Sequence, residues 1–383
     1  MTKKFFRSYS VSCLVALSLL VSCRGAGGAT AVIDGGDTVS MDYARRLTIV
    51  DYPGYTFVSI QNPWDTTRTL HNYLLIPDSL PLPENLPDGT IIRTPLKRSI
   101  VHSSIHCQLI DELGAGEAIK GVCDAQYMLA PRIKEGIKSG EIADCGVNTS
   151  PDIEKVVEVN PDAILLSPYQ DSGTYGKLAT LPISIVECAD YMEISPLARA
   201  EWIKFFGRLY GKDAKADSIF EAVKSSYNSL KEKTSGVESR PKVLLDRLYG
   251  RQWFVPVAES TIATLLRDAG GVNPFDNLNS SGSVALSAEQ VLVDAGDASV
   301  WIIRYLMPQP MTLQNLKAEN KIYSQFDAFK SGNVYGCNTS KILLFEDSSF
   351  HPERALSDLI NIIHPELSDS PSTQYFFTRL DEK

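Results

Sequence analysis

The longest uninterrupted helical pattern lies in the middle of the chain, over residues 213–234. It contains neither glycine nor proline, and Gly211 and Gly236 bound it. Asp213 is the predicted N-cap, and a helix of this length spans roughly 33 Å. Its apolar residues recur every three or four positions and so share one helical face; they are Ala216, Ile219, Phe220, Val223, Tyr227 and Leu230. We therefore expect a rigid helix between two folded parts, although an ordinary surface helix of one large domain would show the same pattern.

Short β-rich runs alternate with helical patterns on both sides of this helix, which predicts parallel βαβ units. Before it, strands are predicted at 98–104, 118–123, 161–168 and 182–188, and helices at 105–114, 150–160, 174–181 and 195–210. After it, strands are predicted at 241–248, 298–306 and 332–337, and helices at 258–271, 287–296, 313–318 and 351–367. The expected fold class is α/β, with two Rossmann-like α/β lobes joined by a single long rigid helix.

A different pattern precedes the first lobe. Residues 41–96 contain four β-rich runs separated by turns that carry proline or glycine, at 47–52, 55–60, 71–77 and 89–96. We interpret this segment as an N-terminal β-rich extension laid on the first lobe. A small separate domain is the alternative.

The first 23 residues have the three parts of an export signal: a basic start, a short apolar run, and the tetrapeptide Leu20-Val21-Ser22-Cys23. The tetrapeptide resembles a bacterial lipobox, which implies lipidation of Cys23 and a periplasmic, membrane-anchored lipoprotein; a plain signal peptide or an N-terminal anchor are alternatives. The predicted boundaries are 1–23 for the signal peptide, 24–40 for a flexible tether, 41–96 for the extension, 97–212 for the first lobe, 213–235 for the linker helix, 236–367 for the second lobe and 368–383 for a frayed tail.

Composition narrows the classes of function. The chain has 383 residues, of which 44% are apolar and 22% charged, as in soluble globular proteins. Its net charge of −9 becomes −12 once the three basic residues of the leader are removed. An acidic protein without a basic stripe is a poor nucleic-acid binder, so we expect no such partner. Five cysteines follow Cys23 without any CxxC spacing, which favours free, partly buried thiols over disulfides or a zinc site.

Four phrases carry a resemblance to a known family: residues 112–122, 150–168, 287–303 and 350–367. In this order, around a helix without glycine or proline, they resemble the periplasmic binding proteins of ABC importers for iron–siderophore, haem and cobalamin. The resemblance covers roughly residues 96–367 and does not include the extension. It implies two lobes joined by one long helix, a ligand between them, and a permease dimer as partner. Such proteins dock on permease arginines through two glutamates, and the resemblance implies that Glu154 and Glu289 have this role. The alternative is that both are ordinary solvated charges on helices.

Ligands of parallel sheets collect beyond the carboxyl ends of the strands. On the first lobe this selects His102, Ser103, Tyr127, Tyr169 and Gln170. On the second lobe the most suggestive stretch is 247–254, where two arginines and three aromatics follow a strand; its candidates, with one from a later strand, are Arg247, Tyr249, Arg251, Trp253, Phe254 and Tyr305. Arginine pairs with anionic groups and aromatics line flat ligands, although about half of such aromatics simply pack a core.

Three ligand classes stay open, namely iron–siderophore complexes, haem and cobalamin. Haem would add an axial ligand, for which His102 and His351 are candidates. A bare Zn or Mn site needs several converging ligands, and only five histidines are present, so the metal-ion alternative is weaker. No nucleophile elbow, HExxH, P-loop or GxGxxG after a strand occurs, and we therefore expect a binding protein without a cofactor rather than an enzyme. A structural surface lipoprotein is the remaining alternative.

Overall fold

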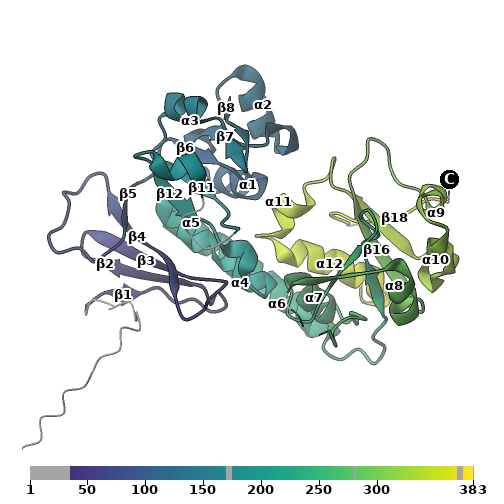
Figure 1. Cartoon of the computed structure of the whole chain (residues 1–383). Helices are drawn as coiled ribbons and strands as arrows, with labels where there is room; N and C mark the ends of the chain where they lie inside the picture. Colours follow the sequence, from purple (N-terminus) through teal and green to yellow (C-terminus); the bar gives the residue numbers. More distant parts are fainter. Residues whose placement is uncertain (1–34, 170–174, 279, 281, 369–373, 383) are drawn as a thin grey trace, which may run out of the picture. The chain divides into compact units, whose positions relative to one another are not determined.

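The computed structural model describes residues 35–169, 175–278, 280, 282–368 and 374–382 (Figure 1). The described residues belong to one compact unit. Cys23 and the other predicted features of the leader lie outside them. Among the described helices, none combines the length and the apolar character that a bilayer span requires.

The predicted extension forms a five-stranded sheet in the order β1-β2-β3-β4-β5. Its neighbouring strands pair antiparallel except β4 and β5, which run parallel. Gly54, with a φ of +95°, allows the tight turn between β2 and β3. The strands are β1 Asp37–Thr38, β2 Leu47–Tyr52, β3 Tyr55–Gln61, β4 Thr69–Pro77 and β5 Thr90–Thr94. Buried residues of this sheet, such as Tyr73, belong to the same hydrophobic core as Phe205 of the first lobe, so the extension packs on that lobe.

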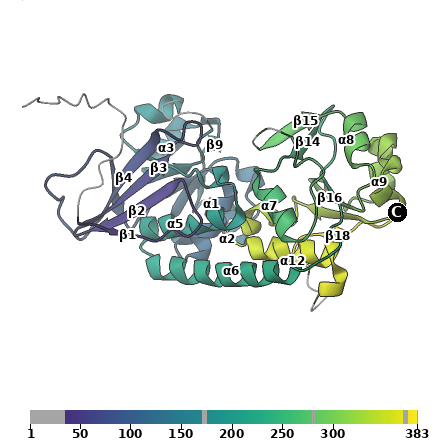
Figure 2. The same ribbon diagram turned by 90° about the horizontal axis from the view of Figure 1, so that it is seen from below.

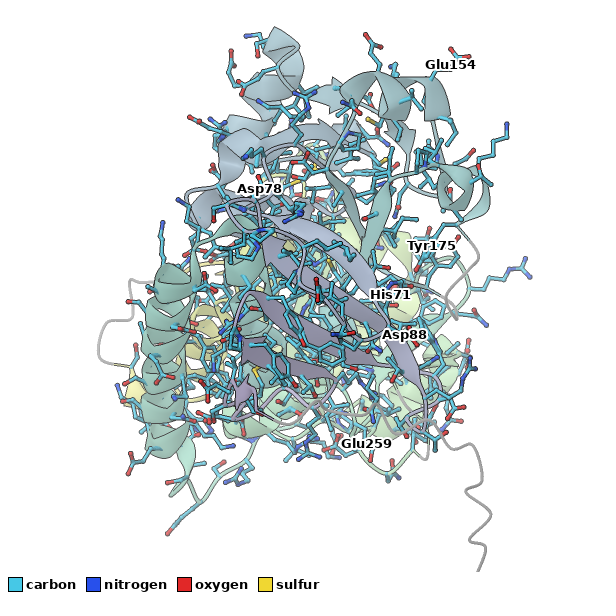
Figure 3. The ribbon with its side chains drawn as sticks, turned by 90° about the vertical axis from the view of Figure 1, so that its left-hand side faces the viewer. His71, Asp78, Asp88, Glu154, Tyr175 and Glu259 are labelled. Atoms are coloured by element: carbon cyan, nitrogen blue, oxygen red, sulfur yellow. The ribbon has the colours of Figure 1, made fainter. Side chains whose placement is uncertain are left out.

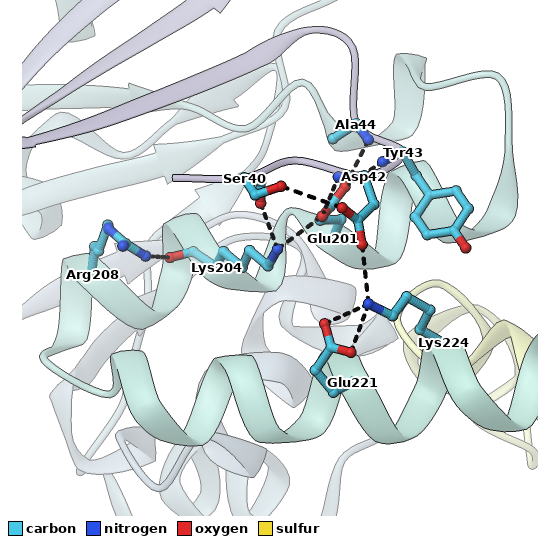
Figure 4. A network of polar contacts seen from close by, with 9 residues as sticks. All are labelled: Ser40, Asp42, Tyr43, Ala44, Glu201, Lys204, Arg208, Glu221 and Lys224. Carbon is cyan, nitrogen blue, oxygen red and sulfur yellow. Dashed lines mark hydrogen bonds and ion pairs between the residues drawn. The ribbon is translucent and has the colours of Figure 1, made fainter. Parts of the chain in front are cut away.

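Two buried carboxylates fix the start of the extension. Glu201 accepts hydrogen bonds from the backbone N–H groups of three consecutive residues, 42–44, at 2.8–2.9 Å, and pairs with Lys204 at 2.9 Å (Figure 4). Glu193 accepts from the next two N–H groups, at residues 45 and 46. Glu201 is fully buried. Because a buried carboxylate is stable only when it is well hydrogen-bonded, this arrangement defines one position for the chain.

The first lobe is a parallel five-stranded sheet in the order β12-β11-β6-β7-β8. The strands are β6 Ser99–Val101, β7 Ile119–Val122, β8 Ala143–Asp144, β11 Ala163–Leu166 and β12 Ser184–Glu187, and the helices are α1 Ser104–Glu112, α2 Pro131–Ser139 and α3 Ile153–Val159. A small hairpin, β9 Gly146–Val147 with β10 Ser150–Pro151, precedes α3. All four predicted strands are confirmed. The predicted helix at 174–181 is a 3₁₀ helix, Gly176–Thr180, and α2 was not predicted.

The central helix, α6, runs from Asp213 to Thr234 as its pattern predicts. The N-cap residue is Lys212 rather than Asp213, which lies inside the first turn, so that prediction was wrong. The preceding amphipathic pattern forms two helices, α4 Pro196–Glu201 and α5 Ile203–Tyr210, which meet at Trp202. In Figure 2, α6 lies along α12 of the second lobe, and it also packs against α5. A single long helix therefore contacts both lobes.

The second lobe has a four-stranded sheet in the order β13-β16-β17-β18, of which the first three strands are parallel. The strands are β13 Val243–Leu245, β16 Val300–Tyr305, β17 Val334–Asn338 and β18 Thr378–Arg379, with a separate two-stranded antiparallel sheet of β14 Trp253–Pro256 and β15 Ser283–Leu286. The helices are α7 Thr261–Asp268, which lies between β14 and β15 in the chain, α8 Ala288–Ala295, α9 Leu313–Glu319, α10 Asp327–Lys330, α11 Leu344–Ser348 and α12 Pro352–Ile363. The sequence did not predict the two-stranded sheet.

The predicted fraying of the tail is contradicted by its described part. β18 pairs antiparallel with β17, and Phe376 and Phe377 are buried. The fully buried carboxylate of Asp358 accepts hydrogen bonds from the backbone N–H groups of residues 375–377 at 2.7–3.1 Å. Two aromatic side chains and three backbone donors therefore hold a segment that composition alone predicted to be loose.

The two lobes contact each other where α1 packs on α11. Ser104 donates a hydrogen bond to Glu346 at 2.8 Å across this contact. Close by, the ring of His351 lies between the carboxylates of Glu112, at 2.8 Å, and Glu353, at 3.0 Å. Burial alone would lower the pKa of His351, but these two hydrogen bonds outweigh it and raise the pKa to about 9. At neutral pH the lobes therefore share a buried imidazolium paired with carboxylates.

Candidate functional site

The first cavity lies at the carboxyl ends of the first-lobe strands β6 and β11. Its volume is about 630 Å³, and its lining includes His102, which follows β6, and Ser167, which follows β11. The hairpin before α3 adds Asn148, and the far side is formed by Tyr169 and Tyr175. This is the edge at which open parallel sheets bind ligands.

His102 is the most confined polar group of this cavity. Its side chain is 5% exposed, and its Nδ1 lies 2.6 Å from Oδ1 of Asn148. Its Nε2 is buried and has no hydrogen-bond partner among the described residues. Burial lowers the pKa of His102 more than the Asn148 contact raises it, so the imidazole is neutral at pH 7. A neutral, unpartnered ring nitrogen beside a cavity is available to a ligand once a small movement exposes it.

The second cavity, about 310 Å³, lies at the carboxyl ends of β13 and β16 in the second lobe. Leu245 and Ile302 form an apolar floor, and one arginine approaches from each side, Arg199 from α4 and Arg304 from β16. Tyr191 also lines it, and its hydroxyl donates a hydrogen bond to the carbonyl of Pro168, between two lining residues of the first cavity. The two cavities therefore flank one contact between Pro168 and Tyr191.

Both arginines of the second cavity are oriented by aspartates. The Nε of Arg199 lies 3.0 Å from Asp190, and Asp190 also accepts from His106 at 2.8 Å. Burial by itself would raise the pKa of Asp190, but His106 and Arg199 outweigh it and hold the pKa below its usual range. Arg304 pairs with Asp246 at 2.9 Å, and its guanidinium lies 5.7 Å from the ring of Phe345. An arginine has five N–H donors, so each guanidinium retains donors for an oxygen-rich ligand.

A sequence model described as "Periplasmic binding protein" matches residues 106–340 of this chain. The chain belongs to the periplasmic binding protein family. Its members are substrate-binding proteins. Three of the four phrases that carry the resemblance fall within the matched residues, and the fourth, 350–367, lies beyond them. The extension lies wholly outside the matched range.

Two proteins of known sequence are similar to this chain over most of its length. An uncharacterized lipoprotein of Methanocaldococcus jannaschii is 28% identical over 363 residues, which cover 88% of this chain and 85% of that protein. Residues 97–383 are 287 of the 383 residues, which is a smaller part of the chain than the 88% that the match covers. The match therefore includes part of the extension. The petrobactin-binding protein YclQ of Bacillus subtilis is 25% identical and covers 64% of this chain and 76% of its own length. The homologues of this family member thus include lipoproteins.

Solved structures of the family have the same fold. A periplasmic heme binding protein from Pseudomonas aeruginosa has a TM-score of 0.59 at 16% identity, and covers 74% of this chain and 97% of its own. The periplasmic vitamin B12 binding protein BtuF of Vibrio cholerae has a TM-score of 0.53 at 15% identity, and covers 72% of this chain and 99% of its own. The expected pair of α/β lobes joined by a long helix is therefore confirmed.

Several predicted ligand residues do not line either cavity of this protein. Trp253 is fully buried and stacks on Trp301 at 5.7 Å, and its Nε1–H donates to the carbonyl of Leu245, so its selection as a cleft residue was wrong. Tyr305 is 7% exposed, and its hydroxyl accepts from the N–H of Met311. Both side chains belong to the hydrophobic core of the second lobe and not to a cleft.

The other second-lobe candidates do not line either cavity. Arg247 forms an ion pair with Glu319 at 3.0 Å. Tyr249, Arg251 and Phe254 are exposed, on or beside the turn that leads into β14. The sequence predicted a strand end facing the cleft at 247–254, whereas the chain makes a turn there and enters the separate two-stranded sheet of β14 and β15.

On the first lobe, the cavity includes two of the five predicted residues, His102 and Tyr169. Ser103 is the N-cap of α1 without a side-chain cap bond, and Tyr127 is 59% exposed outside both cavities. Gln170 lies outside the described residues. His351, the other candidate axial ligand for haem, has both ring nitrogens bound to carboxylates and is an imidazolium, which has no lone pair for a metal.

The predicted ligand residues include none of Arg199, Arg304 and Tyr175. Arg304 was interpreted as an edge-strand charge, although it lies at the carboxyl end of a predicted strand and meets the rule that selected His102. Arg199 lies inside a predicted amphipathic helix, and nothing in the local pattern separates it from other helix charges. Among the described residues, no group of three or more His, Cys, Asp or Glu side chains is placed to hold a metal ion.

Glu154 and Glu289 share a local setting. Each is exposed in the first turn of a helix, Glu154 in α3 and Glu289 in α8. Asp152 and Ser287 are the respective N-caps, and both accept backbone N–H groups with their side chains. Hydrogen bonds from its own backbone N–H and from Ser287 lower the pKa of Glu289. Figure 3 shows Glu154 at the outer edge of the first lobe, where a partner can reach it.

Proposed function

We propose that this protein is the lipid-anchored, substrate-binding component of an ABC importer and that it captures a bulky metal chelate, namely an iron–siderophore complex, haem or cobalamin. The observation that carries this proposal is the pair of adjoining cavities at the carboxyl ends of the two parallel sheets. Family membership supports the role of a substrate-binding protein, and the relatives that bind petrobactin, haem or vitamin B12 support the chelate class.

The lining of the cavities suits such a ligand. Arg199 and Arg304 offer oriented donors to carboxylate, catecholate or phosphate oxygens, while Tyr169 and Phe345 offer half-exposed rings to a flat face. Nε2 of His102 is the nitrogen that would serve as an axial ligand if the chelate were haem. The family consists of substrate-binding proteins, which supports capture of the ligand rather than its chemical conversion.

Capture at the membrane would end in delivery to a permease dimer. Lipidation of Cys23 would anchor the protein, and residues 24–40 would tether it. Glu154 and Glu289 would then pair with arginines on the two permease subunits, which favours correct orientation and fast association more than affinity. Glu289→Lys reverses the charge of a residue that lines neither cavity, and it is expected to reduce transport strongly without changing chelate affinity.

A ligand screen tests the proposal. Thermal unfolding of the leaderless protein is followed with cobalamin, cobinamide, haem, ferric catecholates, ferric hydroxamates, Zn²⁺ and Mn²⁺. A ligand at 100 times its Kd stabilises the folded state by about 2.7 kcal/mol, a readily measured shift of Tm. A saturable shift with one chelate class is the expected result. Silence with all chelates, or a response to Zn²⁺ or Mn²⁺ alone, contradicts the proposal.

A variant pair locates the binding site. Arg304→Gln removes a guanidinium from the second cavity, whereas Arg251→Gln removes an exposed one that lines neither cavity. We expect the first change to weaken binding of the chelate roughly tenfold or more, as loss of a charged hydrogen bond does, and the second to leave it unchanged. Equal effects of the two changes would place the ligand elsewhere.

A further inference from the structure

A third cavity, about 550 Å³, lies along the seam between the extension and the first lobe. The extension contributes His71 from β4 and Thr90 from β5, and the lobe contributes Tyr175 and the edge strand β12, including Glu187. Neither His71 nor Thr90 falls within the part of the chain that the family shares. This cavity is therefore a feature that the extension adds to the common fold.

A buried carboxylate organises the polar side of this seam cavity. Glu187 is 1% exposed; its Oε2 lies 3.0 Å from Nδ1 of His71, and its Oε1 accepts a hydrogen bond from the hydroxyl of Tyr175. Burial and the neighbouring carboxylate raise the pKa of Tyr175, so its hydroxyl stays protonated and donates. One carboxylate therefore holds together a side chain of the extension and one of the first lobe.

The ring of His71 is held in one orientation by its neighbours but remains partly exposed to solvent. Its Nε2 lies 2.7 Å from Oγ1 of Thr90, and its ring stacks on Tyr73 with centroids 4.4 Å apart and an interplanar angle of 13°. Its side chain is nevertheless 29% exposed. A side chain that is already held in one orientation and is still partly exposed can contact a ligand at little ordering cost.

Tyr175 connects this seam cavity to the candidate ligand site, because it lines both the seam cavity and the first cavity. Figure 3 shows His71 and Tyr175 near each other on the face viewed. A bulky ligand in the first cavity can therefore extend past Tyr175 to the extension. The seam cavity is lined by no lysine or arginine among the described residues, and its acidic group is buried, so it suits hydrogen-bond donors and disfavours anions.

We propose that His71, Thr90, Tyr175 and Glu187 form a subsite that binds an uncharged or cationic, hydrogen-bond-donating arm of the chelate, such as an amide, hydroxyl or amine, and that excludes carboxylate arms. This inference rests on the proposed function. It gives the extension a role in selectivity: an amide-bearing corrinoid or an amine-bearing hydroxamate is accepted, and a chelate whose arms end in carboxylates is not.

Matched ligands test the chemistry of the arm. The first pair is cobalamin and its monocarboxylic acids, in which one side-chain amide is replaced by a carboxylate. The second is a ferric trihydroxamate with a free amine arm and the same compound with that amine succinylated. Affinities are measured by isothermal titration with the full-length mature protein. We expect the donor form of at least one pair to bind roughly tenfold more tightly, since like charges are not tolerated beside a buried carboxylate.

Variants connect this preference to the seam cavity. Thr90→Val and His71→Asn are expected to weaken the donor form roughly fivefold, which corresponds to one hydrogen bond, and to reduce the preference for it. Thr48→Val is the matched control, because Thr48 is an exposed threonine of the same sheet on β2. Glu187→Gln should remove the discrimination against carboxylates; if it does not fold, the other two variants still decide the question.

The outcomes separate the two proposals. If a chelate binds but neither the matched ligands nor the seam variants differ, the subsite is refuted and the proposed function stands. If no chelate binds the unaltered protein, the proposed function fails and the subsite fails with it. A loss of affinity in Thr48→Val as large as in Thr90→Val would also refute the subsite, because it would show a general effect on the sheet.

Discussion

The extension and the second lobe are attached to the first lobe in different ways. At the start of the extension, two buried carboxylates, Glu201 and Glu193, accept five consecutive backbone N–H groups, and the adjoining sheet shares the hydrophobic core of the lobe. At the contact of α1 with α11, the polar links are one hydroxyl and an imidazolium between carboxylates. The attachment of the extension fixes the position of its backbone. The contact between the lobes joins side chains, which can move apart, and one of them, His351, can lose its proton.

This difference fits the proposed function and the proposed subsite. A segment that contributes to a binding subsite must not move relative to the lobe that holds the rest of the site, because pre-organisation reduces the cost of binding. Two lobes that enclose a ligand must be able to move, and side-chain contacts between helices permit such movement more readily than backbone contacts do. Four predictions test this comparison, beginning with the largest effect.

Glu201→Ala should have the largest effect. It leaves three backbone N–H groups, of which that of Ala44 is buried, without their acceptor and removes one partner of the Lys204 ammonium, and we expect the free energy of unfolding to fall by about 3–5 kcal/mol. Urea unfolding measures the change, and limited proteolysis should show cleavage in the extension first. The matched control is Glu232→Ala, at an exposed glutamate of α6. A loss below about 1 kcal/mol would show that the extension does not depend on this carboxylate.

The contact between the lobes should depend on pH. His351 has its pKa raised from 6.5 to about 9 in the folded protein, so its stabilising contribution is complete below pH 6.5 and is lost as the pH rises through 9. The shift corresponds to at most about 3 kcal/mol. Stability curves between pH 6 and 10 should show this loss in the unaltered protein and not in His351→Gln. An equal slope in both proteins would assign the loss to other groups.

Ser104→Ala removes the hydroxyl that donates to Glu346 across the same contact. Glu346 is 8% exposed, so it loses a partner that water replaces poorly, and we expect a cost of about 1 kcal/mol. Chemical denaturation provides the measurement. Ser139→Ala, which removes a hydroxyl bonded within its own helix, is the control. If the control costs as much, the effect belongs to serine loss in general and not to the lobe contact.

The smallest effect is expected at the exposed part of the extension's attachment. Lys224 pairs with Asp42 at 3.0 Å and with Glu221 in Figure 4, but it lies near the surface. Lys224→Gln should cost about 0.5 kcal/mol or less, and the cost should disappear in 1 M salt, where the Debye length is about 3 Å. A cost close to that of Glu201→Ala would mean that charge, rather than burial, holds the extension.

The cysteines show how far a simple count can lead. The absence of CxxC spacing and an odd number after Cys23 predicted free thiols, and all five described cysteines are free and buried. Burial raises the pKa of Cys123 to about 12, so this thiol is protonated and unreactive at neutral pH. Here composition was sufficient, because no long-range pairing was involved.

The sequence by itself determined most of the elements and their order, although α2 and the pairing of β14 with β15 were not predicted. The stripe of α6, the alternation of strands and helices and the β-rich extension depend on contacts between residues a few positions apart, and the structure confirms them. It also selected two residues that line the first cavity, because His102 and Tyr169 follow predicted strands. Local patterns suffice for such features, since periodicity reflects which face of an element is buried.

Only the tertiary structure decided which side chains meet. Trp253 looked like a cleft residue and is in the core, because the chain turns at 249–252 and enters β14, whose pairing with β15 was not predicted. Arg199 meets the second cavity, Asp358 holds a tail that appeared loose, and His71 reaches Glu187 across 116 positions of sequence. These contacts depend on how sheets and helices pack. The separation of two residues along the sequence does not show whether their side chains meet in the folded protein.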